Sequence, residues 1–175
     1  LVNGKLISKS FNHEEKDKIF INNFDYKNEI ILNRENTLNF LNNALAKDGF
    51  SLEVSKNYKF KKPLVIYNQL SNSLKETILN NKNSIILNEN SELTLINLVD
   101  NASKENFMIN VMEDIKLKKD ASLKSILINN TKNNAYFYKY LKNDLEKNSN
   151  LENYILSSGL KLNKLDIEVH HIEEH

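Results

Sequence analysis

The sequence predicts a mainly β protein whose strands wind into a solenoid after a short mixed segment at the N-terminus. Two observations predict it. Beyond Gly49, apolar and polar residues alternate with the period of two that is typical of half-buried strands. A polar corner also recurs at intervals of 33, 30 and 28 residues, as in coils that each bury an apolar edge against the next. An antiparallel meander with similar hairpin turns is the alternative, because irregular repeats of this length also arise by chance.

Residues 1–49 are expected to form a hairpin and a short helix ahead of the core at residues 50–175. Residues 2–5 place an Asn-Gly pair between apolar flanks, which is a strong hairpin signal. Residues 7–35 are mixed and polar, and their structure is not assigned. A helix is then predicted, because Asn36 can cap it and Gly49 is a suitable residue to end it. The residues with helical spacing are Leu38, Phe40, Leu41, Ala44 and Leu45.

The polar corner has three closely similar copies. In each copy an apolar residue is followed three positions later by Asn or Asp, then by Ser or Ala, and six positions later by Leu. The copies read LNENSEL at residues 87–93, LKKDASL at 117–123 and LEKNSNL at 145–151, and a weaker copy reads VSKNYKF at 54–60.

In a solenoid the equivalent residues of successive coils stack. The first leucines of the corners (Leu87, Leu117 and Leu145) are therefore predicted to form one inward ladder, and the last leucines (Leu93, Leu123 and Leu151) another. Asn90, Asp120 and Asn148 are predicted to sit at the bend, where their side chains bond neighbouring backbone or accept positive φ.

Composition and charge exclude several classes of function. The 24 basic residues nearly balance the 23 acidic ones, and Arg34 is the only arginine, so a nucleic-acid partner is not expected. No window approaches the roughly 18 apolar residues of a membrane span, and the N-terminus lacks a signal-peptide core. We therefore expect no membrane partner and a cytoplasmic location. The absence of cysteine excludes disulfides, thiolate nucleophiles and thiolate metal ligands within these residues.

The ordered motifs resemble the SufB/SufD family of the SUF iron–sulfur cluster assembly machinery, and within it the SufD branch. LVNGKLI resembles the family's VNG-x-F opening, and LNNALAKDG resembles the helix that ends in LN-x-A-x-x-x-DG. Asn90-Ser91 stands where Gly-Ala is usual, and Lys164 stands where Arg is common. The other matching stretches are KPL at residues 62–64, SIILNENSELTLINLVDN at 84–101 and SSGLKLNKLDIEVHHIEEH at 157–175.

The SufD branch is favoured over SufB by the VNG opening and by LTLINLVDN, which lacks the cysteine that SufB-like chains often place after that strand. This resemblance implies a right-handed parallel β-helix. It also implies a non-enzymatic scaffold subunit that pairs with SufB and binds the ATPase SufC, while homodimer formation stays open.

The chain begins without Met and stops at His175 without a turn, so we expect an excised segment whose β-helix is truncated at its C-terminal end. In the family, the interface histidine, the pairing strands and the SufC-binding helices lie downstream of the matched residues. No catalytic, cofactor-binding or metal residue is therefore carried over to this chain. The resemblance also implies that the iron–sulfur cluster is handled by the parent complex.

Three local features of the sequence each have a functional and a purely structural interpretation. In HHIEEH, the side chains of His171, Glu173 and His175 share one strand face and could converge on a metal, although a polar strand end is the favoured interpretation. The tyrosines of the run at residues 136–140 are expected on a half-buried strand rather than on an exposed contact stripe or sugar-stacking platform. Charges around the corners are expected to be solvated; they are Glu89, Glu92, Lys116, Lys118, Lys119 and Lys124.

A β-helix carbohydrate-active enzyme, such as a polysaccharide lyase, is the alternative function. Such an enzyme needs clustered carboxylates and a positioned base. The aspartates here are scattered among corners and strands, and a carboxylate pair for hydrolysis cannot be located from sequence.

Overall fold

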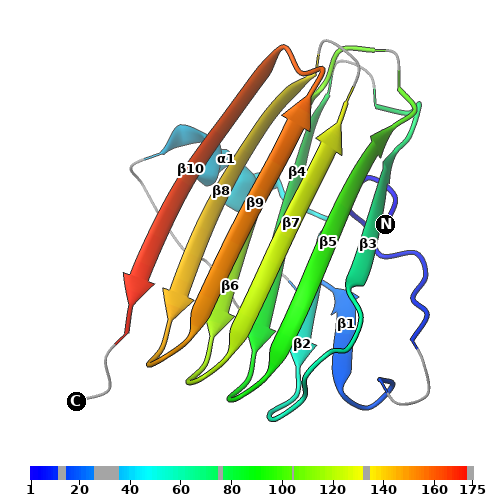
Figure 1. Cartoon of the computed structure of the whole chain (residues 1–175). Helices are drawn as coiled ribbons and strands as arrows, with labels where there is room; N and C mark the ends of the chain where they lie inside the picture. The colour runs from blue at the N-terminus through cyan, green and yellow to red at the C-terminus, as the bar shows by residue number, and fades with distance from the viewer. Residues whose placement is uncertain (12–14, 26–35, 75–76, 104, 132–134, 173–175) are drawn as a thin grey trace.

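Two facing β-sheets and one short helix make up the fold in the computed structural model, which describes residues 1–11, 15–25, 36–74, 77–103, 105–131 and 135–172 (Figure 1). The elements in chain order are β1 (Ile19–Asn23), α1 (Thr37–Leu45), β2 (Phe50–Val54), β3 (Leu64–Leu70), β4 (Ile78–Leu87), β5 (Glu92–Asn101), β6 (Met108–Leu117), β7 (Ser122–Asn130), β8 (Tyr136–Leu145), β9 (Asn150–Ser158) and β10 (Leu162–His171).

The chain alternates between the two sheets, so that each coil contributes one strand to each. One sheet has the order β1-β2-β4-β6-β8-β10, and we call it the even sheet; the other has the order β3-β5-β7-β9, and we call it the odd sheet. Apart from the antiparallel pair β1–β2, all neighbouring strands are parallel, so the meander alternative is wrong. The chain runs up the odd sheet and down the even sheet as it advances toward β10, which is a right-handed winding (Figure 1). The predicted right-handed parallel β-helix is confirmed.

The corners have the backbone conformation that the repeat predicted. Asn90, Asp120 and Asn148 have φ of 55°, 58° and 57°, and Asn57 in the weaker copy has φ of 62°. Each corner bonds to the next, since the amide of Asn90 donates to the carbonyl of Lys119 at 3.0 Å. Side chains add to this stack, because Asn90 Nδ2 donates to Asn57 Oδ1 at 2.9 Å and Asn148 Nδ2 donates to Asp120 Oδ1 at 3.0 Å. Asparagine and aspartate tolerate the left-handed conformation, which explains why they recur here in place of glycine.

Both predicted leucine ladders are present. Leu87 pairs with Leu117 and Leu117 with Leu145 in the even sheet, and all three are buried. In the odd sheet, the register joins Leu93, Leu123 and Leu151 in the same way. The ladders form the centre of the main hydrophobic core, which therefore runs along the solenoid axis between the sheets.

The N-terminal hairpin is also confirmed. Val2 and Lys5 exchange two backbone hydrogen bonds, of 2.9 and 3.0 Å. Asn3 and Gly4 between them have φ of 50° and 86°, as a tight two-residue turn of the primed type requires. The unassigned stretch at residues 7–35 contains β1, whereas residues 12–14 and 26–35 lie outside the described part of the chain. The boundary between residues 49 and 50 stays a prediction.

Helix α1 begins where it was predicted, since Asn36 Oδ1 accepts from the amides of Leu38 and Asn39 at 2.9 and 3.4 Å. It ends at Leu45, earlier than expected. Gly49 has another role: a Cβ there would lie 1.7 Å from the carbonyl oxygen of Lys82, so the chain can pass against β4 only without a side chain. None of the described helical residues forms a segment long and apolar enough to cross a membrane.

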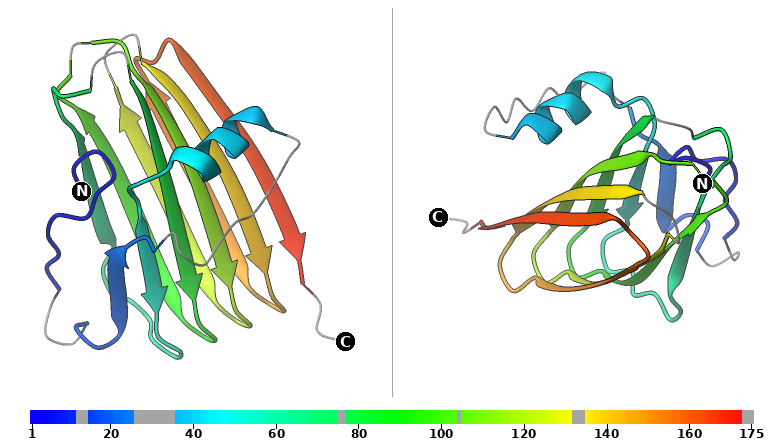
Figure 2. Two further views of the ribbon diagram at one scale, coloured as in Figure 1. Left: turned by 180° about the vertical axis from the view of Figure 1, so that it is seen from behind. Right: turned by 90° about the horizontal axis from the view of Figure 1, so that it is seen from above.

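The buried face of α1 is polar. Asn39 and Asn42 are buried, whereas Phe40 and Leu45 are 51% and 52% exposed. Asn42 Nδ2 donates to the carbonyls of Asn81 at 3.0 Å and Asn110 at 2.7 Å. The helix therefore covers the outer face of the even sheet (Figure 2) through amide hydrogen bonds of its two fully buried residues, and Leu38 adds apolar packing against Met112, Tyr138 and Tyr140.

Candidate functional site

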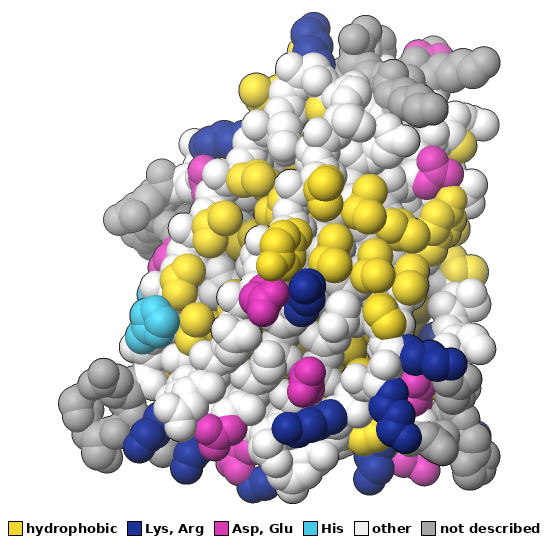
Figure 3. Space-filling view, viewed as in Figure 1, with side chains coloured by type: hydrophobic (Ala, Val, Ile, Leu, Met, Phe, Trp, Pro, Cys, Tyr) yellow, Lys and Arg dark blue, Asp and Glu magenta, His cyan; other side chains and the backbone are white. Residues whose placement is uncertain are grey.

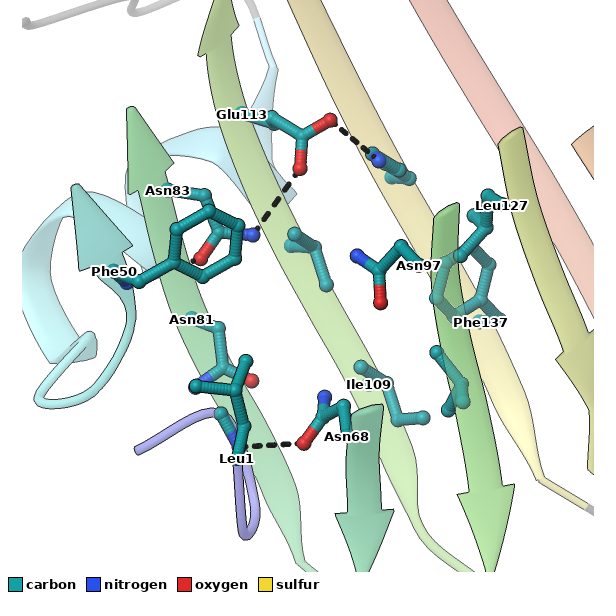
Figure 4. A pocket seen from close by; sticks show the side chains of 14 residues that line it. Leu1, Phe50, Asn68, Asn81, Asn83, Asn97, Ile109, Glu113, Leu127 and Phe137 are labelled. Atoms are coloured by element: carbon teal, nitrogen blue, oxygen red, sulfur yellow. Dashed lines mark hydrogen bonds and ion pairs between the residues drawn. The ribbon is translucent and has the colours of Figure 1, made fainter. Parts of the chain in front are cut away.

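A polar cluster lies inside the solenoid, where apolar side chains are the rule. Lys139 Nζ on β8 lies 2.7 Å from Glu113 Oε1 on β6, and Asn83 Nδ2 on β4 donates to Glu113 Oε2 at 3.2 Å (Figure 4). All three residues occupy inward positions of their strands. They lie between the leucine ladder, which is at the C-terminal ends of these strands, and the N-terminal ends of the same strands. The register pairs Glu113 with Leu141, so Lys139 is its diagonal neighbour on the adjacent strand.

This cluster was missed by sequence reasoning, although a signal was present. In YFYKYL, Lys139 has the same phase as Phe137 and Leu141, which are buried. In VMEDI, Glu113 likewise falls in phase with Val111 and Ile115. Charged residues of opposite sign at inward positions of adjacent coils predict a buried ion pair, because an isolated charge would be costly to bury.

A small cavity lies beside the ion pair. Its volume is about 30 Å³, and asparagines from both sheets line it together with apolar side chains (Figure 4). Within the described part of the chain, Asn97 Oδ1 is buried without a hydrogen-bond partner. A space of this size holds about two water molecules, whereas sites for sugars and other organic ligands are roughly 300 Å³ or more. The interior is therefore suited to water and not to an organic substrate. The asparagines are Asn68, Asn81, Asn83 and Asn97.

A second polar cluster fastens the start of α1 to the last two even strands. The Tyr138 hydroxyl accepts from Asn36 Nδ2 at 2.8 Å, and it lies 2.8 Å from Asp166 Oδ2. Asn36 Nδ2 also donates to Asp166 at 3.0 Å, and Lys164 Nζ lies 3.1 Å from the same carboxylate. The capping residue of the helix is thus itself held by β8 and β10.

The cluster shifts two pKa values. Burial, followed by the hydrogen bond to Asp166, raises the pKa of the Tyr138 hydroxyl well above its ordinary value. Burial acts to raise the pKa of Asp166, but the hydrogen bonds from Tyr138 and Lys164 outweigh it and lower that pKa. Tyr138 therefore remains a neutral donor to an ionised carboxylate.

His170 on β10 lies between two carboxylates. Its Nδ1 is 3.0 Å from Asp144 Oδ1, and its Nε2 is 2.6 Å from Glu168 Oε1. The hydrogen bond from the Tyr140 hydroxyl lowers the pKa of Glu168, and His170 adds to this effect. Because each ring nitrogen faces a different carboxylate, the group is a hydrogen-bonded chain. Among the described residues, no three or more His, Asp or Glu side chains are placed to hold a metal ion.

The metal hypothesis for HHIEEH stays a prediction. His171 is exposed at the end of β10, in register with Leu145. Glu173 and His175 lie outside the described residues.

The corner charges agree with the prediction of solvated charges, and several of them also form ion pairs. Lys118 Nζ lies 2.6 Å from Glu146, and Lys124 Nζ lies 3.6 Å from Glu152, at side chains that are partly exposed. Lys56 pairs with Glu89 in the same way across the first corners.

The prediction of a half-buried tyrosine strand is wrong for two of its residues. Tyr138 and Tyr140 are 1% and 8% exposed. They point away from the lumen, but α1 and the side chains of β10 cover them there. Sequence periodicity identifies the outer face of a strand and does not reveal what covers it.

Comparison with known proteins adds one match. Residues 69–175, more than half of the chain, match the family described as "SUF system FeS cluster assembly, SufBD core domain". The matched part contains every strand from β4 to β10 and so includes the ion pair, most of the residues that line the cavity and three of the corners. No curated protein matches the chain.

Proposed function

Because the chain belongs to the SufB/SufD family and takes part in iron–sulfur cluster assembly by the SUF system, we propose that it is a SufD-like scaffold subunit. It acts with a SufB-like subunit and a SufC-like ATPase, and it has no enzymatic activity of its own. The single observation that carries the proposal is the family match over residues 69–175. The cluster is the cargo of the assembly.

The cysteine content supports the SufD assignment over SufB. Protein-bound iron–sulfur clusters are held mainly by cysteine thiolates, and the chain has no cysteine. Thiolate ligands for a nascent cluster would therefore come from outside these 175 residues. The VNG opening and the cysteine-free stretch LTLINLVDN point the same way.

The interior of the solenoid supports a scaffold role. Leucine ladders fill one part of the lumen, and the buried ion pair with its cavity of about 30 Å³ occupies another. Such an interior holds the coils in register, and the cavity beside the ion pair is too small for an organic substrate. The surfaces available for function are then the outer faces and the ends, which suits a protein that positions partners.

Co-purification tests the assignment. The complete gene product containing these 175 residues is tagged and co-expressed with the SufB-like and SufC-like proteins of its source organism. We expect one stable complex of all three in native mass spectrometry. If the protein stays free of both partners in the presence of each, the proposed role is wrong.

Anaerobic reconstitution with iron and sulfide tests the division of labour. We expect the protein alone to retain no cluster absorbance after desalting and the complex with the SufB-like subunit to retain it. A stoichiometric cluster on the protein alone would contradict the proposal. Parallel assays on uronate polymers address the polysaccharide lyase alternative, and turnover there would favour it.

A further inference from the structure

The outer face of the odd sheet carries two rows of apolar side chains that cross all four strands. The register places Val65, Ile96, Ile126 and Tyr154 in one row, and Tyr67, Leu98, Ile128 and Leu156 in the other. We call these eight residues the apolar band. They form a continuous hydrophobic surface across the middle of the face (Figure 3).

The apolar band is exposed, unlike the outer face of the even sheet. Tyr67, Tyr154 and Leu156 are 49%, 48% and 57% exposed, and the other members are exposed or half-buried. Helix α1 lies over the opposite face of the solenoid (Figure 2). Large contiguous apolar patches are rare on monomeric proteins and mark interaction sites.

Polar rows border the apolar band on both sides, and their charges are largely paired within the chain. Lys124 Nζ lies 3.6 Å from Glu152 on one side, and Lys124 also lies over the Tyr154 ring at 5.2 Å. On the other side, the Tyr67 hydroxyl donates to Asp100 Oδ2 at 2.8 Å. A partner can therefore cover this face without burying these charges unpaired. The border residues are Thr94, Lys124 and Glu152 on one side and Gln69, Asp100, Asn130 and Ser158 on the other.

We propose that the apolar band is a homodimer interface, in which it packs against the apolar band of a second copy of this chain. A two-fold axis parallel to the strands, between β5 and β7, places each row of the apolar band on the same row of the second copy. Ile96 then meets Ile126 of the second copy, because β5 lies over β7. Face-to-face packing of two sheets with nearly aligned strands is a standard arrangement.

The border rows favour a second copy as the occupant. Under the same axis, Thr94 faces Lys124 of the second copy, and Asp100 faces Asn130. No like charges oppose one another in either row, and Asp100 gains an amide as a donor. The surface is therefore complementary to itself, as a two-fold interface requires.

The size of the face also suits a small dimer interface. Four strands about 4.8 Å apart and four outward rows about 7 Å apart give a face on the order of 20 by 27 Å. Because side chains make the surface uneven, the accessible area of the face exceeds this flat area and approaches the roughly 800 Å² that each partner buries in a standard interface. A dissociation constant in the micromolar range is expected, because the face is smaller than a standard interface and weak, transient complexes lie at that end of the size range.

Sedimentation of the 175-residue chain tests the proposal at about 1 to 200 μM, a range that brackets this affinity. The wild-type chain, of 20.4 kDa, should shift from monomer to dimer. Ile128→Glu and Leu156→Glu place a charge in the apolar band and should each raise the dissociation constant at least tenfold. Ile78→Glu is the matched control, because Ile78 is 49% exposed on the even sheet; it should leave the dimer unchanged. Urea midpoints confirm that all variants fold.

A distance measurement separates this interface from any other. The chain has no cysteine, so Asn130→Cys carries a single spin label on the border row. Two labels in the proposed dimer should lie on the order of 10–20 Å apart, given a sheet spacing of about 10 Å. Lys47→Cys, beside α1, should give no such short distance. A chain that is monomeric at the highest concentration overturns the proposal, as does a dimer that survives both glutamate variants or lacks the short distance. These outcomes do not depend on the SUF role.

Discussion

Lys139 Nζ lies 2.7 Å from Glu113 Oε1 inside the solenoid, and the two side chains are 6% and 3% exposed. A buried pair of this kind adds little net stability relative to apolar residues, but loss of one partner leaves the other charge without compensation.

Lys139→Met is expected to lower the free energy of unfolding by about 3–5 kcal/mol, as measured by urea denaturation. The double variant Lys139→Met/Glu113→Leu should recover most of that loss, because it removes both charges. Lys124→Met breaks an exposed pair with Glu152 and should cost no more than about 1 kcal/mol. Equal effects of the two lysine substitutions would show that the interior pair is solvated.

The positive φ of 58° at Asp120 predicts a clear difference between two substitutions. Asp120→Gly and Asp120→Val both remove the acceptor of the Asn148 hydrogen bond. Only valine adds the clash of a β-branched side chain in the left-handed region. The free energy of unfolding of the valine variant should therefore be lower than that of the glycine variant by about 1–2 kcal/mol. Thermal or urea unfolding of the pair measures this. Equal stability would mean that the corner relaxes to another conformation.

The lowered pKa of Asp166 predicts a dependence of stability on pH. The folded state favours the ionised form of Asp166. The contribution of this carboxylate to the free energy of unfolding is therefore complete above its pKa in the unfolded chain, about 3.9, and is lost as pH falls toward its lower pKa in the folded state. The stability advantage of the wild-type chain over Asp166→Asn should therefore be constant from pH 7 to pH 5 and shrink below about pH 4. Urea midpoints at several pH values test this. An advantage that grows on acidification would contradict the assigned direction.

Gly49→Ala is expected to destabilise the junction between α1 and the solenoid. The new Cβ would lie 1.7 Å from the carbonyl oxygen of Lys82, so β2 and β4 must separate locally. A loss of about 1–3 kcal/mol or more is expected for such overpacking. Lys47→Ala, an exposed neighbour, should change stability by less than about 0.5 kcal/mol. Wild-type stability of the glycine variant would show that the approach is not tight.

The elements that sequence predicted best are those set by local chemistry. The Asn-Gly hairpin, the Asn36 cap and the asparagine corners each depend on the conformations that a few adjacent residues can adopt. The leucine ladders follow from the spacing of the corners, because equal coils bring equivalent residues into register.

Prediction was weaker where a contact joins residues that are distant in sequence. The asparagine face of α1 was missed because the spacing of its leucines predicts an apolar buried side, whereas the fully buried residues are Asn39 and Asn42 and Leu38 is only partly buried. Its true partners are carbonyl oxygens of Asn81 and Asn110, on two later strands. The tyrosine strand failed for the same reason, since its outer face is covered by that helix.

The sequence by itself thus predicted a solenoid, its corners and its inward ladders, because periodicity and turn chemistry act over a few residues. Only the tertiary structure decided which polar residues share the interior and which outer face is covered. The ion pair of Glu113 and Lys139 requires a particular diagonal between adjacent coils. The apolar band is exposed, and Tyr138 is buried, because α1 lies over one sheet and not over the other. A period of two distinguishes the faces of a strand, but burial depends on what packs there.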